Sequence, residues 1–162
     1  MTLTKAIRFD EIGTPDVLRY VDVEVGEPSV GEVRIRHVAV GLNYADTYFR
    51  NGTYKIPMPN GMGVEASGVV EQIGEGVTNV KVGDRVTYTG FINTLGAYSE
   101  ETLVPANALI QLPEGISCET AAAMTMRGLT SAYLMRRIYA FKAGDSILLH
   151  AAAGGVGLIV AQ

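Results

Sequence analysis

Short, mainly hydrophobic runs occupy most of the first hundred positions, and the polar or turn-forming residues Gly, Pro, Asn and Asp interrupt them about every ten residues. The runs are rich in Val, Ile, Thr and Tyr, which is typical of β-strands in a barrel or sandwich. Turn signals such as GEPSVGE, PNGMG and GEGVTNVKVGD separate the runs. We therefore predict strands over Lys5–Phe9, Leu18–Val23, Glu32–Gly41, Glu65–Ile73, Arg85–Thr89 and Ala97–Val104.

The pattern becomes helical after the sequence LPEG. The stretch SCETAAAMTMRGLTSAYLMRRIYAF is rich in Ala, Met and Leu and contains no proline. It predicts one helix over Cys118–Met124, with a cap at Ser117, and a second helix over Gly128–Ala140. A further short helix is predicted over Tyr44–Arg50, and an apolar strand over Ser146–His150 follows the turn KAGD.

The sequence HAAAGGVG after that strand has the spacing of a dinucleotide-binding loop. Ala152 stands in the first glycine position, and Gly154 and Gly157 stand in the next two. Glycines let the backbone approach a pyrophosphate, and the helix that follows supplies N–H groups. The motif alone is equally typical of a tight turn between a strand and a helix, but the strand SILLH before it favours the cofactor interpretation.

Composition narrows the classes of protein. A chain of 162 residues with 48% hydrophobic and 19% charged residues is typical of a globular protein with its own core. The net charge of -4 argues against nucleic acid as a partner. The single cysteine, Cys118, excludes an intramolecular disulfide and a cysteine-rich zinc cluster. We find no signal peptide and no apolar run that could span a membrane, so we expect a cytoplasmic protein.

Six segments occur in an order that resembles a known family. They are VAVGLNYADTYFRNGTY, GMGVEASGVVEQIGEGV, VGDRVTY, GAYSEETLVPA, LPEGISCETAAAMTMRGLTSAYLM and LLHAAAGGVG. Together they resemble the zeta-crystallin type of quinone oxidoreductase, in the medium-chain dehydrogenase/reductase superfamily. The resemblance extends over essentially the whole chain, but over only the first half of a typical member.

The resemblance implies a fold that is mainly β with some helices. A GroES-like β-barrel catalytic domain would occupy residues 1–125, and an inter-domain helix with the first strand, loop and helix of a Rossmann domain would occupy 126–162. Because the rest of a Rossmann sheet would lie after Gln162, we expect the chain to be an N-terminal fragment that is inactive by itself and binds cofactor weakly or not at all. We also expect a homodimer in the family.

The implied activity is NADPH-dependent reduction of a quinone, or of a similar electron-poor small molecule, without zinc. Zinc-dependent relatives hold the metal with a Cys and a His at positions that read Asn43 and Val64 here. Valine has no lone pair, so the tetrahedral ligand set is missing and we expect no catalytic zinc. Hydride transfer would then depend on the placement of cofactor and acceptor.

The resemblance also implies which residues form the site. Tyr48 and Tyr54 would be catalytic, each donating a hydrogen bond to a quinone oxygen, although tyrosines in a β-rich domain commonly serve packing. The cofactor would contact Asn43, Tyr44, Asp46, Tyr48, Thr130, Tyr133, Ala152, Gly154, Gly155, Val156 and Gly157. Arg127 stands where the family usually has Lys before Gly-Leu-Thr, which keeps the charge but changes its geometry.

Several other polar residues fit structural roles better. We expect Glu65 to be a buried hydrogen-bond partner, Cys118 to be packing, and His37 to lie on the polar edge of its strand. His150 is expected to be a hydrogen-bonded structural histidine.

Two other functions stay open. A zinc-free enoyl reductase of the same superfamily would share most of these features. A GroES-like binding or assembly module without catalysis would have no reason to carry the loop at residues 152–157.

Overall fold

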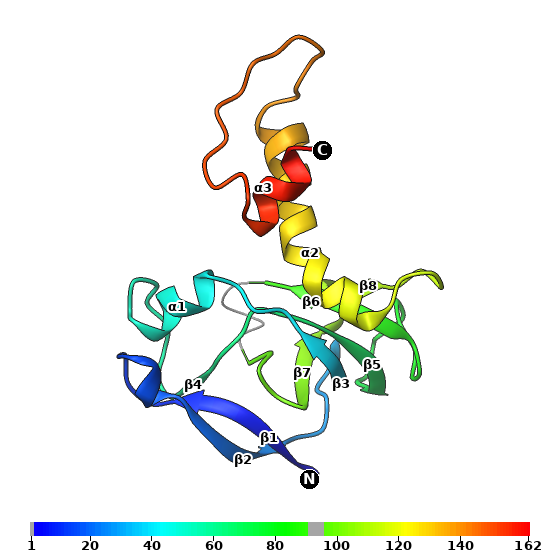
Figure 1. The fold of residues 1–162 in the computed structure, drawn as a ribbon. Helices are drawn as coiled ribbons and strands as arrows, with labels where there is room; N and C mark the ends of the chain where they lie inside the picture. The colour runs from blue at the N-terminus through cyan, green and yellow to red at the C-terminus, as the bar shows by residue number, and fades with distance from the viewer. Residues whose placement is uncertain (1, 91–95) are drawn as a thin grey trace. The chain divides into compact units, whose positions relative to one another are not determined.

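The computed structural model describes residues 2–90 and 96–162, which form two compact units, Met1–Ala123 and Met124–Gln162 (Figure 1). The first unit is mainly β, as the short runs rich in Val, Ile, Thr and Tyr predict. Its strands are β1 (Thr2–Phe9), β2 (Arg19–Val25), β3 (Glu32–Val40), β4 (Asn60–Gly61), β5 (Glu65–Ile73), β6 (Arg85–Thr89), β7 (Glu101–Pro105) and β8 (Ile110–Gln111). The helix α1 (Ala45–Arg50) and two 3₁₀ turns, η1 (Pro15–Val17) and η2 (Ala106–Ala108), complete it.

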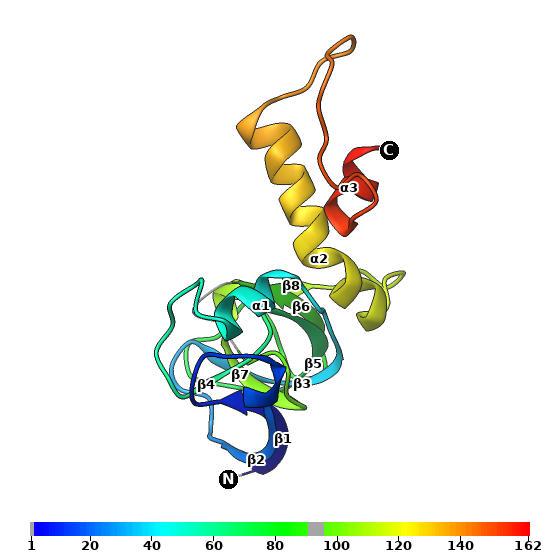
Figure 2. The same cartoon turned by 60° about the vertical axis from the view of Figure 1, so that its left-hand side comes forward.

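The strands of the first unit form two antiparallel sheets. The larger sheet has the order β7-β3-β5-β6-β8, and the smaller has the order β2-β1-β4. Figure 2 shows β1 and β2 side by side as a hairpin. A bridge between Ala6 and Ser99 joins the two sheets, with the Ile7 N–H donating to the Tyr98 carbonyl at 2.8 Å. The described strands pair as these two separate sheets and do not close into one full barrel.

Alternation along the strands builds the core of the first unit. In β3, Val33 and Ile35 are fully buried, and the charged residues between and beside them point to the other face. Tyr88 from β6 packs in the same cluster. A strand that is apolar on one face and polar on the other therefore fixes which side of the larger sheet faces the core.

Most predicted strands lie where expected. The bounds of β5 and β6 agree with the prediction residue for residue, and those of β1, β2 and β3 differ by one to three residues at their ends. The strand predicted over Ala97–Val104 is shorter, since β7 begins only at Glu101. The two-residue strands β4 and β8 are too short to produce an alternating pattern.

The two helices predicted after residue 117 form one continuous helix, which corrects the sequence interpretation. Helix α2 runs over Cys118–Tyr133, passes through Gly128, and continues into a π-helical segment η3 (Leu134–Ile138). A glycine inside a helix costs about 1 kcal/mol relative to alanine but does not break the hydrogen-bond ladder. The cap is as predicted: Ser117 Oγ accepts from the Thr120 N–H at 3.2 Å.

The strand predicted over Ser146–His150 is absent, and this is a second correction. Residues 146–149 have no regular secondary structure, and most of the segment is exposed. A strand exists only when its backbone pairs with another, and the described residues of the second unit contain no partner strand. The helix expected after the glycine loop is present as α3 (Gly155–Val160), which lies beside α2 in both views (Figures 1 and 2).

Candidate functional site

The segment between β3 and α1 gathers several of the predicted site residues around a buried carboxylate. Asp46 lies in the first turn of α1 and is 3% exposed. Its Oδ2 accepts the Asn43 backbone N–H at 2.9 Å and the Tyr98 hydroxyl at 2.6 Å. Because Tyr98 lies 52 positions further along the chain, this bond fixes the start of α1 to the segment that leads into β7.

The environment of Asp46 shifts two ionisation equilibria. Burial raises the pKa of the Asp46 carboxyl above its ordinary value, although the hydrogen bonds from Tyr98 and Asn43 oppose the shift. Burial and the bond to Asp46 raise the pKa of the Tyr98 phenol, which therefore stays protonated and continues to donate. Asp46 Oδ1 is buried and accepts no hydrogen bond from the described residues. Asp46 therefore fixes the start of α1 through hydrogen bonds, while its own carboxylate is shielded from solvent.

Asn43 is held from a second direction by Glu65. The Asn43 side-chain Nδ2 donates to Glu65 Oε2 at 2.8 Å, and Glu65 is 1% exposed at the start of β5. The backbone adds a contact, since the Gly41 N–H donates to the Glu65 carbonyl at 2.9 Å. The expectation that Glu65 is a buried hydrogen-bond partner is confirmed.

Gly41 makes this arrangement possible. A Cβ at this position would collide with the Glu65 carboxylate and would lie 2.6 Å from the Ala122 carbonyl oxygen. The chain therefore needs glycine here because of close packing rather than an unusual backbone angle.

Three tyrosines and one phenylalanine form a continuous aromatic chain on and after α1. Ring centroids lie 5.4 Å apart for Tyr44 and Tyr48, 5.3 Å for Tyr48 and Tyr54, and 5.4 Å for Phe49 and Tyr54, all edge to face. Phe49 is buried and anchors the chain, whereas Tyr44 is 76% exposed. Tyr48 is half-buried, and its hydroxyl has no hydrogen-bond partner among the residues described. An accessible phenol without an internal partner can donate to a ligand oxygen.

Asn43 and Val64, which stand where the zinc-dependent relatives have metal ligands, have structural roles in this chain. Asn43 is bonded to Glu65, and Val64 is fully buried in the core. Within residues 2–90 and 96–162, no group of three His, Cys, Asp or Glu side chains is placed to hold a metal ion. The residues present do not fit a catalytic zinc.

Both histidines depart from their expected settings. His37 lies on β3, a central strand, and not at a polar edge: its Nδ1 bonds the Ser99 carbonyl at 2.7 Å and its Nε2 bonds the Tyr88 hydroxyl at 2.9 Å. His150 is exposed and makes no hydrogen bond with the described residues, because the strand that was to carry it does not form. Cys118, by contrast, is buried as the packing interpretation predicts.

The glycine loop lies in the second unit and is internally well packed. A Cβ on Gly157 would lie 2.6 Å from the Ala152 Cα, so only glycine allows the loop to cross the helix here. A Cβ on Gly155 would meet the Arg127 side chain at 2.5 Å, which places the stem of that cationic residue against the start of α3. Ala152, Gly154 and Gly155 are exposed, and Val156 is half-buried.

Thr130 and Tyr133 share one face of α2, three residues apart. Thr130 is half-buried and Tyr133 is exposed. Between them, Ser131 is buried, and its hydroxyl donates to the Arg127 carbonyl at 2.8 Å and lies 3.5 Å from the Val156 carbonyl. This contact connects α2 to α3 within the second unit.

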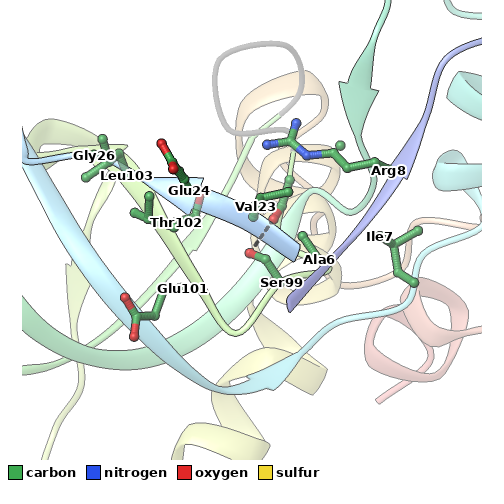
Figure 3. A pocket seen from close by; sticks show the side chains of 13 residues that line it. Ala6, Ile7, Arg8, Val23, Glu24, Gly26, Ser99, Glu101, Thr102 and Leu103 are labelled. Atoms are coloured by element: carbon green, nitrogen blue, oxygen red, sulfur yellow. Dashed lines mark hydrogen bonds between the residues drawn. The ribbon is translucent and has the colours of Figure 1, made fainter. Parts of the chain in front are cut away.

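Two cavities in the first unit lie outside the predicted site. Figure 3 shows one of about 190 Å³ between β1, β2 and β7, with Arg8 and Glu101 on its wall. Another, of about 340 Å³, is mainly apolar, and Leu42 and Tyr98 line it beside the Asn43–Asp46 turn. None of the predicted site residues lines either of these two cavities.

Sequence reasoning missed Tyr98 and Gly41. Tyr98 is one of eight tyrosines and nothing in its local sequence connects it with Asp46. Gly41 ends a predicted strand and reads as an ordinary turn residue, because its contact with Glu65 depends on the pairing of β3 with β5.

Comparison with known proteins gives a consistent picture. Residues 29–114 match the family model for the alcohol dehydrogenase GroES-like domain. A quinone oxidoreductase of Pseudomonas aeruginosa is 48% identical over 161 residues, which is 99% of this chain and 49% of that protein. A 2-haloacrylate reductase of a Burkholderia species is 41% identical over 157 residues, 91% of this chain and 46% of that protein.

Solved structures agree with the sequence comparison. The crystal structure of Escherichia coli quinone oxidoreductase complexed with NADPH superposes with a TM-score of 0.92 at 43% identity, covering 96% of this chain and 48% of that one. The chain thus spans about half the length of the relatives it matches. Among the described residues, no helix is long and apolar enough to cross a membrane.

Proposed function

The chain belongs to the family of alcohol dehydrogenase GroES-like domains, and from this membership we propose that it is part of an NADPH-dependent quinone oxidoreductase that works without zinc. The mostly β fold and the resemblance to quinone oxidoreductases are confirmed by the matching family model and by quinone oxidoreductases at 44 to 48% identity. The proposed division of labour assigns residues 1–125 to catalysis and residues 126–162 to the start of the nucleotide-binding domain. The observation that carries the proposal is the segment at residues 43–50, which holds the accessible Tyr48 phenol and, in the place of a zinc ligand, an asparagine bonded to Glu65.

The residues present fit a nicotinamide dinucleotide. The loop at residues 152–157 has the glycine that such a motif needs at its tightest crossing, and Arg127 brings positive charge to it. Bound NADPH would supply a hydride, which together with one proton from solvent reduces a quinone to a hydroquinone. We assign the loop to the pyrophosphate, and Asn43, Tyr44, Asp46, Tyr48, Thr130 and Tyr133 to the nicotinamide end.

In this proposal the chain's own residues position and polarise the reactants. The Tyr48 hydroxyl donates a hydrogen bond to the quinone oxygen on which negative charge develops. Tyr54 packs edge to face on Tyr48 and restricts its ring, and Phe49 anchors both to the core. Asp46 acts from beneath the surface by fixing the first turn of α1. No metal is required, because a quinone already accepts electrons readily.

A second acceptor class has specific support. The 41% identical relative is named a 2-haloacrylate reductase, and an activated carbon–carbon double bond beside a carboxylate is electron-poor in the way that a quinone is. The same phenol could stabilise the developing enolate oxygen.

An acceptor panel tests the proposal. The protein in its natural length is mixed with NADPH and with a benzoquinone, a naphthoquinone or 2-chloroacrylate in turn, and NADPH absorbance is followed. We expect oxidation with the quinones and slower or no oxidation with 2-chloroacrylate. Oxidation with 2-chloroacrylate alone would move the assignment to the second class, and no oxidation with any acceptor would reject both.

A further inference from the structure

Asn43 is held at both its backbone and its side chain by two buried carboxylates. Asp46 accepts its backbone N–H at 2.9 Å, and Glu65 accepts its side-chain Nδ2 at 2.8 Å. Asp46 and Glu65 are 3% and 1% exposed, so both bonds are shielded from water. Asn43 itself is half-buried at the surface. These two shielded hydrogen bonds hold the Asn43 amide in one orientation although it lies at the surface.

The Glu65 contact also decides which end of the amide faces outward. A carboxylate accepts hydrogen bonds and donates none, so the nitrogen of Asn43 must point at Glu65 and the oxygen must point away. Asn43 Oδ1 accepts no hydrogen bond from any residue that the structure describes. The segment that leads into and through α1 thus carries a fixed and unused acceptor on Asn43 and an unused donor on the Tyr48 hydroxyl.

A fixed acceptor selects ligands by their donors. An oxidised quinone carries oxygen acceptors and no N–H or O–H, so it cannot bond to Asn43 Oδ1. The carboxamide NH₂ of a nicotinamide is a donor and can. The acceptor on Asn43 and the donor on Tyr48 therefore suit different reactants: Asn43 fits the carboxamide, and Tyr48 fits the quinone oxygen.

We propose that Glu65 is a positioning residue that orients the Asn43 amide so that Oδ1 receives the carboxamide N–H of the nicotinamide. The inference rests on the proposed function and assigns a task to a residue that touches neither reactant. Gly41 supports it, because any side chain at that position would displace the Glu65 carboxylate. A glutamine in place of Glu65 could pair with either end of the amide and would lose the orientation while keeping a bond.

The test compares KM for NADPH with KM for the quinone in the protein of natural length. For Glu65→Ala we expect KM for NADPH to rise about tenfold, as for the loss of one oriented hydrogen bond, and KM for the quinone to stay unchanged. For Glu65→Gln we expect a rise of about twofold, since about half of the amides would face the wrong way. Glu71→Ala is the matched control, because Glu71 lies on the same strand but pairs with the exposed Arg36.

Equal rises in both KM values, or a loss of thermal stability with both KM values unchanged, would overturn the proposal. A direct readout separates it from the proposed function. The Asn43 side-chain amide gives a pair of ¹H–¹⁵N resonances, which we expect to be sharp and shifted in the wild type and to move toward ordinary exposed-amide positions in Glu65→Ala. If the wild type fails to bind NADPH, the proposed function fails, and the resonances still decide whether Glu65 orients Asn43. Resonances identical in the wild type and both Glu65 variants would refute the positioning role.

Discussion

Gly41 lies at a position of the candidate site where there is no room for a side chain. An added methyl would collide with the Glu65 carboxylate and with the Ala122 carbonyl, and neither is the free end of a flexible chain on an open surface. We predict that Gly41→Ala lowers the free energy of unfolding by about 1–3 kcal/mol, the usual cost of forcing atoms into a packed site. Denaturant unfolding of the two proteins measures the difference.

Gly115→Ala is the control for this prediction. A Cβ at Gly115 meets nothing within 4 Å, so the substitution should change the unfolding free energy by no more than about 0.5 kcal/mol. Equal effects at the two positions would show that the close approach of Gly41 to Glu65 is not what makes glycine necessary.

Tyr48 carries the second residue-scale prediction. In the protein of natural length, Tyr48→Phe should lower quinone turnover by about ten- to a hundredfold, because one hydrogen bond that strengthens in the transition state is worth about 1–3 kcal/mol. The melting temperature should change little, since the Tyr48 hydroxyl has no partner within the described chain. Tyr20→Phe, at an exposed tyrosine away from α1, should leave turnover unchanged. A large fall in melting temperature with full turnover would assign Tyr48 to packing alone.

The sequence identifies the surface residues of the site better than the residues that support them. Asn43 and Val64 stand out because they replace expected metal ligands, and both positions are visible in a short motif. Tyr98 bonds to Asp46 from 52 positions away, and the antiparallel pairing of β3 with β7 brings the segments beside these strands together. A contact of that kind leaves no local pattern, so sequence reasoning cannot find it.

At the scale of elements, β3 and β6 are connected across β5 by a buried pair. His37 bonds the Tyr88 hydroxyl at 2.9 Å, and Gly68 on the intervening strand is its partner in register and has no side chain to obstruct the contact. Because Nδ1 must donate to the Ser99 carbonyl, Nε2 of the neutral ring is left as the acceptor for Tyr88. Burial lowers the pKa of His37 below its ordinary value near 6.5.

This arrangement predicts a pH-dependent stability. His37 takes up a proton more readily in the unfolded chain than in the folded one. The contribution of neutral His37 to the free energy of unfolding is therefore fully present above about pH 6.5, and it is lost as the pH falls toward the lowered pKa. The free energy of unfolding should decrease by up to about 1.4 kcal/mol per pH unit in that range. Unfolding in urea between about pH 7 and about pH 5 measures the slope.

Variants of the two histidines show which of them causes the pH dependence of the unfolding free energy. His37→Gln should reduce it, whereas His150→Gln, at an exposed position, should preserve it. If the wild type and His37→Gln keep the same pH dependence, the buried pair between β3 and β6 is not its source.

The sequence predicts those elements that depend on neighbouring residues, and it fails for those that depend on contacts with distant segments. Strands β5 and β6 are found to the residue because each is a short run with strand-forming residues such as Val and Thr, bounded by turn residues such as Gly and Asp. The break expected at Gly128 is wrong, since the helical preference of the surrounding alanines, methionines and leucines exceeds the cost of one glycine. The apolar run at residues 146–150 has strand composition, but composition does not supply a pairing partner.

At the scale of the whole molecule, the two units differ in the hydrogen bonds that their backbone N–H and C=O groups make. The first unit pairs its strands in two sheets, whereas residues 146–149 of the second have no backbone pairing of that kind in the structure. We predict that in the 162-residue chain the amides of residues 146–150 exchange with solvent orders of magnitude faster than those of β5. Hydrogen exchange followed by mass spectrometry makes the comparison within one sample, and equal protection of both segments would contradict it.

The glycine loop begins directly after these unpaired residues. Its entry is therefore not fixed by a sheet within the described residues, and we expect this to weaken the pyrophosphate binding that we propose for it. The sequence motif predicts the loop and the helix after it correctly, but it cannot predict whether the strand that normally orients them has neighbours.

The proposed enzyme, of which this chain forms part, is a quinone oxidoreductase that needs NADPH and no zinc. The most direct measurement is the rate of NADPH-dependent quinone reduction by the protein of natural length after dialysis against a chelator, with the metal content of the same sample determined. Because Asn43 is bonded to Glu65 and Val64 is buried, the account predicts an undiminished rate in a sample free of zinc. A rate that disappears on dialysis and returns only when zinc is added would contradict it.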